Sequence, residues 1–305
     1  MKLRLAVLTL IGIVILGSSQ VNAQYKAMTL AYQLTHVDTG EPFPSPDGKK
    51  ILFESRVGAN YQLFTMNLDG TSQVQLTRDA TDHDLPSWSP DGKKIAFVSD
   101  RTGHELIYLM NADGTGEQEP VSDPNADSIH PQWSPDSTKL IYCLDDDLHP
   151  PKKNASDILV LDLATKKITT LITGGVNTYP SYSPDGTKVA FRRMIGDMNS
   201  EVFVANSDGT NQRNISNHMA FDGWPSWSPD SKQIAFASNR RSSYQIFLMN
   251  ADGSNVRLLS NTEGRATEPR FSVDGASVFF SNCRAVDFGV DCQVMKASTQ
   301  VPYPR

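Results

Sequence analysis

Pro86-Ser87-Trp88-Ser89-Pro90-Asp91-Gly92 is one copy of a seven-residue string that occurs six times along the 305-residue chain. Successive copies begin 44, 45, 49, 45 and 44 residues apart. Their first residues are Pro42, Pro86, Pro131, Pro180, Pro225 and Pro269. Self-similarity at a fixed period indicates a repeat architecture. The spacing therefore predicts six equivalent structural units of about 45 residues each.

Each repeat has the pattern of four short strands. In the Pro-Asp-Gly turn, the proline ring fixes its own φ, and glycine can adopt a positive φ. Apolar residues then alternate, as at Ile95 and Phe97, which is the pattern of a packed strand. An Asp-Gly hairpin signal such as Asp113-Gly114 follows the third strand, and Leu76-Thr77 ends a fourth. Because radial stacking covers both faces of such sheets, we expect an all-β, six-bladed β-propeller of four-stranded antiparallel blades.

The sequence also predicts how the ring closes. The last repeat has only three strands before the chain ends. The segment Gln33-Leu34-Thr35-His36 matches the fourth-strand string Gln75-Leu76-Thr77-Arg78. We therefore expect an N-terminal strand to complete the last blade.

The Trp-Ser-Pro-Asp-Gly string resembles the repeat of the TolB-like propeller family. The resemblance covers residues 33–298 and implies a six-bladed propeller. The TolB translocation protein has an α/β domain before its propeller, which the present sequence lacks between the predicted leader and the first strand. Some propellers with a similar repeat are metal-dependent polysaccharide lyases that use clustered histidines on the channel face.

Residues 1–23 have the three-part layout of a secretory signal peptide. Lys2 and Arg4 precede an apolar run over residues 5–17, and Val21-Asn22-Ala23 predicts cleavage before Gln24. The alternative is an uncleaved membrane anchor, although the run is shorter than the roughly 20 residues needed to span a bilayer. We expect residues 24–305 to form a periplasmic or secreted propeller, with no transmembrane segment after cleavage.

The formal net charge is −6, and loss of Lys2 and Arg4 with the leader changes it to −8. An acidic protein is a poor candidate for nucleic-acid binding, which depends on neutralising phosphates. Cations, basic partners and neutral ligands are favoured instead.

Three cysteines are present. Cys283 and Cys292 flank an eight-residue stretch between two predicted strands, so they are candidates for a disulfide across a hairpin, or for two free thiols. Cys143 is expected to be a small buried residue.

The residue before each repeat proline is expected to face the channel mouth. These residues are Glu41, Leu85, His130, Tyr179, Trp224 and Glu268. Excluding Leu85, they form a candidate site for a sugar, a peptide or a metal. The alternative is a mouth filled by aromatic side chains and solvated acids.

The loops that lead into the repeats hold four of the six histidines. Together with nearby acids they suggest a divalent metal such as calcium or manganese. The weak candidate ligands are His36, His83, Asp84, His130, His218 and Asp222. No local metal motif is present, so these ligands would have to converge from different blades.

Two functional hypotheses follow. The first is an exported, non-catalytic and monomeric binding propeller that presents its channel mouth to a protein, peptide or glycan. The second is a metal-assisted carbohydrate lyase or hydrolase, which needs at least three of these histidines and acids within about 5 Å of one point.

Overall fold

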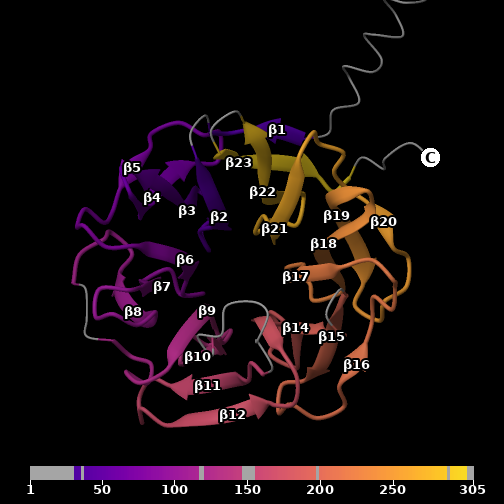
Figure 1. The fold of residues 1–305 in the computed structure, drawn as a ribbon, viewed down its shortest axis with the longest axis horizontal. Helices are drawn as coiled ribbons and strands as arrows, with labels where there is room; N and C mark the ends of the chain where they lie inside the picture. Colours follow the sequence, from indigo (N-terminus) through magenta and orange to yellow (C-terminus); the bar gives the residue numbers. More distant parts are fainter. Residues whose placement is uncertain are drawn as a thin grey trace, which may run out of the picture.

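Six antiparallel sheets surround a central axis in a computed structural model of the chain (Figure 1). The structure describes residues 31–35, 38–116, 120–145, 155–196, 199–286 and 289–300. The predicted leader, residues 1–23, and the candidate ligand His36 lie outside the described residues. No helix among the described residues is long and apolar enough to cross a membrane.

The blades follow the repeats in chain order. Blade one contains β2 (Thr39–Pro44), β3 (Lys50–Val57), β4 (Asn60–Asn67) and β5 (Val74–Gln75). Blade two contains β6 (His83–Trp88), β7 (Lys94–Ser99) and β8 (Leu106–Asn111). Blade three contains β9 (Asp127–Trp133), β10 (Lys139–Asp145), β11 (Ile158–Asp162) and β12 (Ile168–Ile172). Blade four contains β13 (Asn177–Tyr182), β14 (Lys188–Met194), β15 (Ser200–Asn206) and β16 (Arg213–Asn214).

Blade five contains β17 (Asp222–Trp227), β18 (Gln233–Arg241), β19 (Ser243–Asn250) and β20 (Arg257–Leu258). Blade six contains β21 (Arg265–Phe271), β22 (Ser277–Val286), β23 (Gly289–Ser298) and β1 (Ala31–Gln33). The six-bladed, all-β fold predicted from the repeat is confirmed. In its described part, blade two has three strands, although Val121 N–H still donates to Ile107 O as a fourth strand would.

The inner strands are buried on both faces because each blade is packed between two others. In β7, Ile95 and Phe97 join a core cluster with Leu52 and Leu63 of blade one. The alternate residues Ala96 and Val98 belong to the cluster that contains the blade-three core. The aromatic residue of the repeat also contacts a neighbouring blade, since Trp133 Nε1 donates to Ser87 O at 3.2 Å.

The repeated aspartate has a structural role in the turn. Ser89 Oγ donates to Asp91 Oδ1 at 2.7 Å, and Lys93 N–H donates to the same oxygen at 3.1 Å. Asp47, Asp136, Asp185, Asp230 and Asp274 make equivalent bonds. The hydrogen bonds hold the pKa of each of these carboxyls below its usual range, since they favour the charged form.

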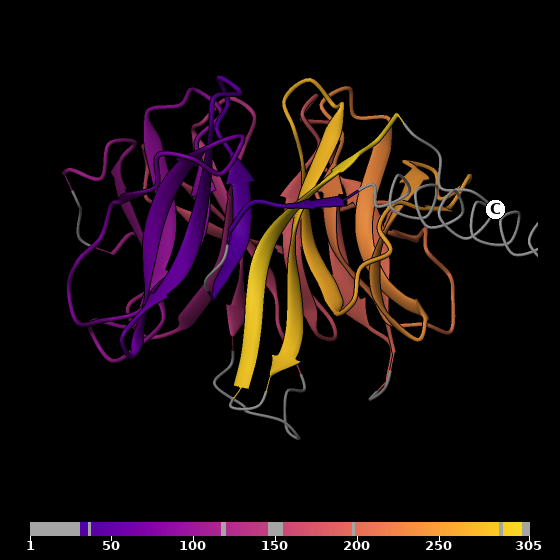
Figure 2. The same cartoon turned by 90° about the horizontal axis from the view of Figure 1, so that it is seen from above.

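The N-terminal strand closes the ring, as predicted. β1 pairs antiparallel with β23, with Ala31 opposite Ala297, and Figure 2 shows this strand crossing the edge of the last blade. Leu34 N–H donates to Val294 O at 2.8 Å, and Val294 N–H donates to Thr35 Oγ1 at 2.9 Å. The same bond to a serine or threonine hydroxyl recurs elsewhere, as from Leu63 N–H to Thr77 Oγ1. β1 is therefore the fourth strand of blade six.

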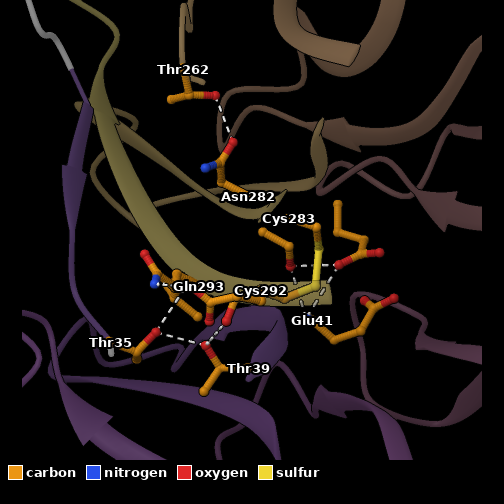
Figure 3. The surroundings of a disulfide bond; sticks show 12 residues. Thr35, Thr39, Glu41, Thr262, Asn282, Cys283, Cys292 and Gln293 are labelled. Atoms are coloured by element: carbon orange, nitrogen blue, oxygen red, sulfur yellow. Dashed lines mark hydrogen bonds between the residues drawn. A yellow bond between two sulfur atoms is a disulfide. The ribbon is translucent and has the colours of Figure 1, made fainter. Parts of the chain in front are cut away.

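A disulfide lies beside this closure. Cys283 and Cys292 face each other in the register of β22 and β23, and their sulfur atoms are 2.12 Å apart (Figure 3). Thr39 Oγ1 donates to Cys292 O, and Thr39 also exchanges a 2.6 Å hydrogen bond with Thr35. Cys143 is buried in blade three.

Candidate functional site

The six residues before the repeat prolines form a ring around the channel, and we call them the ring residues. All six have a left-handed backbone conformation, which is uncommon outside glycine. Their φ values are 47° at Glu41, 48° at Leu85, 56° at His130, 54° at Tyr179, 53° at Trp224 and 56° at Glu268. All six of these strands shift register at this point, as between Gly40 and Phe43. Such bulges redirect side chains and are common beside binding sites.

The ring side chains nearly fill the channel at this level. The remaining space is about 10 Å³, which is room for roughly one water molecule. Gln132 and Arg270 line it from below, together with the prolines that follow three of the ring residues. A ligand at this mouth therefore has to rest on the ring.

One half of the ring is acidic. Glu268 Oε2 accepts hydrogen bonds from Ser281 Oγ at 2.6 Å and from Glu41 N–H at 3.3 Å. Glu54, on β3, accepts from Leu85 N–H at 3.1 Å and extends the acidic half toward Asp84. Gly40 makes room for Glu54, because a Cβ there would lie 3.0 Å from Glu54 Oε1.

Burial raises the pKa of three of these carboxyls. Repulsion by Glu268 and Asp84 raises the pKa of Glu41 further, whereas the nearby Arg270 lowers it. The pKa of Glu54 is also raised by burial and then by the charges of Asp84, Glu41 and Glu268. The pKa of Asp84 rises to about 8, mainly through burial. Burial and mutual repulsion therefore favour the protonated forms of Glu41, Glu54 and Asp84, and a cation placed among them would relieve this repulsion.

The other half of the ring is built from aromatic rings and guanidinium groups. The ring centroids of His130 and Tyr179 are 3.8 Å apart, and those of Tyr179 and Trp224 are 5.4 Å apart. The Arg192 guanidinium lies 4.8 Å from the Tyr179 ring and 5.6 Å from the Trp224 ring. The guanidinium of Arg265, which belongs to blade six, lies 5.6 Å from the Trp224 ring. Cations over aromatic faces are stabilised by the ring quadrupole.

Sequence reasoning missed Glu54 and Arg192, although the repeat contains a signal for them. Both lie twelve residues after their repeat proline. The other blades have small or apolar residues at this position: Val98, Cys143, Ala237 and Ser281. Glu54 in blade one and Arg192 in blade four are thus charged residues at a repeat position that is otherwise uncharged.

The candidate metal ligands are not brought together. His83 is buried, with Nε2 2.8 Å from Asp79, and stacks on Phe97. Asp222 is fully buried and accepts from Arg240 Nη2 at 2.8 Å.

His83, Asp222 and Asn177 occupy the same repeat position, three residues before the proline. Asn177 Oδ1 accepts a hydrogen bond from Arg193 Nε. In blades four and five, the residue at this position therefore holds an arginine of the same blade.

The remaining candidates are also separated. His218 is exposed, and its Nδ1 accepts from Ala220 N–H. His130 is in the ring and contacts Cys143, and Asp84 belongs to the acidic half. Among the described residues, no three His, Cys, Asp or Glu side chains are placed to hold a metal ion.

The opposite end of the channel is open. Five of the residues that stand two positions after a ring residue line the channel below the ring: Phe43, Gln132, Ser181, Ser226 and Arg270. Beyond them lies a cavity of about 370 Å³, which we call the funnel. The sequence did not predict the funnel, because its lining residues come from all six blades and meet only in the folded ring.

The repeat geometry defines a six-bladed β-propeller with a two-sided ring in its channel. Residues 27–149 and 116–301 match the profile of the TolB beta propeller domain. The chain belongs to this family.

Similar proteins include a TolB homolog and solved structures with the same fold. A protein TolB homolog from Chlorobium luteolum is 30% identical over 113 residues, which are 37% of this chain and 24% of that protein. The chain thus spans about a quarter of the length of that relative. The structure of a putative TolB from Agrobacterium tumefaciens has a TM-score of 0.68 at 23% identity and covers 89% of this chain and 97% of its own. Oligogalacturonate lyase from Vibrio parahaemolyticus has a TM-score of 0.61 at 16% identity, covering 90% and 94%.

Proposed function

We propose that the protein is an exported, monomeric binding propeller that holds a peptide segment of a partner protein across the ring face of its channel. The observation that carries this proposal is the two-sided ring. Carboxyl groups of Glu41, Glu54 and Glu268 lie on one side, and Arg192 and Arg265 lie over aromatic rings on the other. A peptide with a basic and an acidic side chain matches this division of charge.

A peptide fits this face better than a glycan. Sugar binding uses the open face of an aromatic ring, but Trp224 is only 7% exposed and is enclosed by Tyr179, Tyr244 and the two arginines. Polar groups at the edge of the ring remain for hydrogen bonds and ion pairs. The face is therefore suited to charged side chains and peptide groups.

The test is to select binders from a displayed library of random heptapeptides, with immobilised protein of residues 24–305 as the target. We expect enriched peptides to carry Lys or Arg together with Asp or Glu. Glu268→Gln, which keeps its hydrogen bonds, and Arg192→Gln should each weaken binding of a selected peptide about tenfold. Asp208→Asn on an exposed outer hairpin is the control. The placement of the site would be contradicted if all variants bound the peptide equally, or if Trp224→Ala bound it as tightly as the original protein.

The metal-assisted carbohydrate lyase or hydrolase is the competing function. Metal analysis of the purified protein, combined with thermal unfolding with and without chelator, separates the two. The binding function predicts no stoichiometric calcium or manganese and an unchanged midpoint temperature. Stoichiometric metal and a chelator-sensitive midpoint would favour the lyase or hydrolase.

A further inference from the structure

The funnel has the walls of a ligand site. The turn prolines of five blades and Val273 of the sixth form its rim. Trp88, Trp133 and Trp227 contribute to the wall between them. A largely apolar cavity of about 370 Å³ with a few polar groups is typical of small-ligand and peptide-end sites.

A positive charge lies at the floor of the funnel. Arg270 lines both the funnel and the small space under the ring, and its guanidinium lies 5.1 Å from the Phe43 ring. Its Nε is buried without a hydrogen-bond partner. Within the described residues, Arg270 forms no ion pair within 4.0 Å, so Glu41 and Glu268 act on it only at longer range. A guanidinium in this state matches a carboxylate, which it binds through two parallel hydrogen bonds.

Neutral polar groups lie beside this charge. The side chains of Gln132, Ser181 and Ser226 line the funnel, and none of them makes a hydrogen bond within the described part of the chain. These side chains can form hydrogen bonds with the amide groups of a peptide, whereas the tail of a fatty acid offers no hydrogen-bonding group. Proline and aromatic walls in turn suit apolar or proline-containing residues.

We propose that the funnel binds the free C-terminal carboxylate of an apolar peptide, with Arg270 as the residue that recognises the carboxylate. This site is separate from the ring face and lies at the other mouth of the channel.

The experiment titrates the protein with N-acetyl-Pro-Phe, as the free acid and as the amide. Tryptophan fluorescence reports binding because three of the four tryptophans line the funnel. We expect saturable binding of the acid and at least about tenfold weaker binding of the amide. Arg270→Gln should weaken the acid about tenfold and leave the amide unchanged, whereas Arg213→Gln on the exposed outer strand should change neither.

A second pair of variants keeps the test valid if Arg270→Gln does not fold. Val273 is 47% exposed at the rim, so Val273→Glu and Val273→Lys alter charge without disturbing the core. At low salt, Val273→Glu should weaken and Val273→Lys should strengthen binding of the acid, each about threefold. No binding at millimolar acid, equal binding of acid and amide, or no effect of any of these variants would overturn the proposal. Tighter binding of dodecanoate than of the peptide would also overturn it, in favour of a lipid.

Discussion

Ser137 and Ser231 show how single residues compensate for departures from the repeat. Both replace the glycine of the Pro-Asp-Gly turn, yet they keep left-handed φ values of 60° and 59°. Each hydroxyl accepts a hydrogen bond from the turn of the preceding blade, from Asp91 N–H to Ser137 and from Asp185 N–H to Ser231, both at 3.1 Å. The serine therefore joins two blades at the cost of backbone strain.

We predict that Ser231→Ala lowers the free energy of unfolding by about 1 kcal/mol, because the strain remains and the hydrogen bond is lost. Ser231→Gly should stay within about 0.5 kcal/mol of the original protein, since relief of strain offsets the lost bond. Urea unfolding measures both. Greater loss in Ser231→Gly than in Ser231→Ala would refute the compensation.

The acidic half of the ring predicts how stability depends on pH. In the folded protein, Asp84 has a pKa of about 8, raised by burial and by the charges of Glu105, Asp82 and Asp100. Between about pH 4 and pH 8 the folded state therefore holds a proton that the unfolded chain has released, and stability falls as pH rises.

We predict that Asp84→Asn removes much of this fall, on the order of 2–5 kcal/mol. The measurement is the free energy of unfolding at pH 5, 6, 7 and 8. Asp208→Asn is the matched control, because hydrogen bonds from Thr210 lower the pKa of Asp208 and its effect is confined to acid pH. A similar slope in the Asp84 variant would show that Glu41 and Glu54 carry the dependence.

Residue-scale features were the least predictable part of the site. The position of the ring residues followed from the repeat, but their left-handed conformation and the tight filling of the channel did not. Both depend on side chains from six blades meeting at one axis. Glu54, Arg192 and Arg270 were missed because strand residues were read as core. Metal candidates such as His83 and Asp222 were assigned to loops, whereas the fold uses them to anchor other side chains.

At the scale of elements, closure of the ring rests on a few bonds between β1 and β23. Thr35 is fully buried, and its hydroxyl accepts from Val294 N–H, 259 residues away in sequence. Thr77 makes the same bond within blade one, where the strands are joined by the chain itself. The two threonines thus form a pair that makes the same bond to the backbone, although Thr35 also exchanges a hydrogen bond with Thr39.

We predict that Thr35→Val destabilises the protein by about 1–3 kcal/mol, because Val294 N–H is left buried without a partner. Thr77→Val should cost a similar amount. Hydrogen exchange distinguishes them, since only Thr35→Val should increase exchange in both β1 and β23. Exchange confined to blade one in both variants would contradict the role of Thr35 in closure.

Elements were well predicted because they depend on local signals. The turn residues, the alternating apolar positions and the fourth-strand string of Gln33 to Thr35 are all visible in sequence. The hairpin between Cys283 and Cys292 followed from their spacing, and the register places them opposite each other. The sequence did not predict that blade two has three strands within the described residues.

For the whole molecule, the repeat period fixes six blades and the matching string fixes how they close. It does not fix which mouth of the channel is open. The ring and the funnel differ in free volume, about 10 against about 370 Å³, because six large side chains meet in the ring, whereas Ser181 and Ser226 leave space in the funnel. Such a difference appears only when all six repeats are placed around one axis.

Closure by β1 determines when the ring can form during synthesis and folding of the chain. The last blade needs residues 31–33 and 289–298, so it cannot assemble until almost the entire chain has left the ribosome. Pairing across so many residues is also slow to nucleate. On the proposal that the protein is exported, this delay keeps the chain unfolded for longer, and the ring closes only after both strands have reached the same compartment.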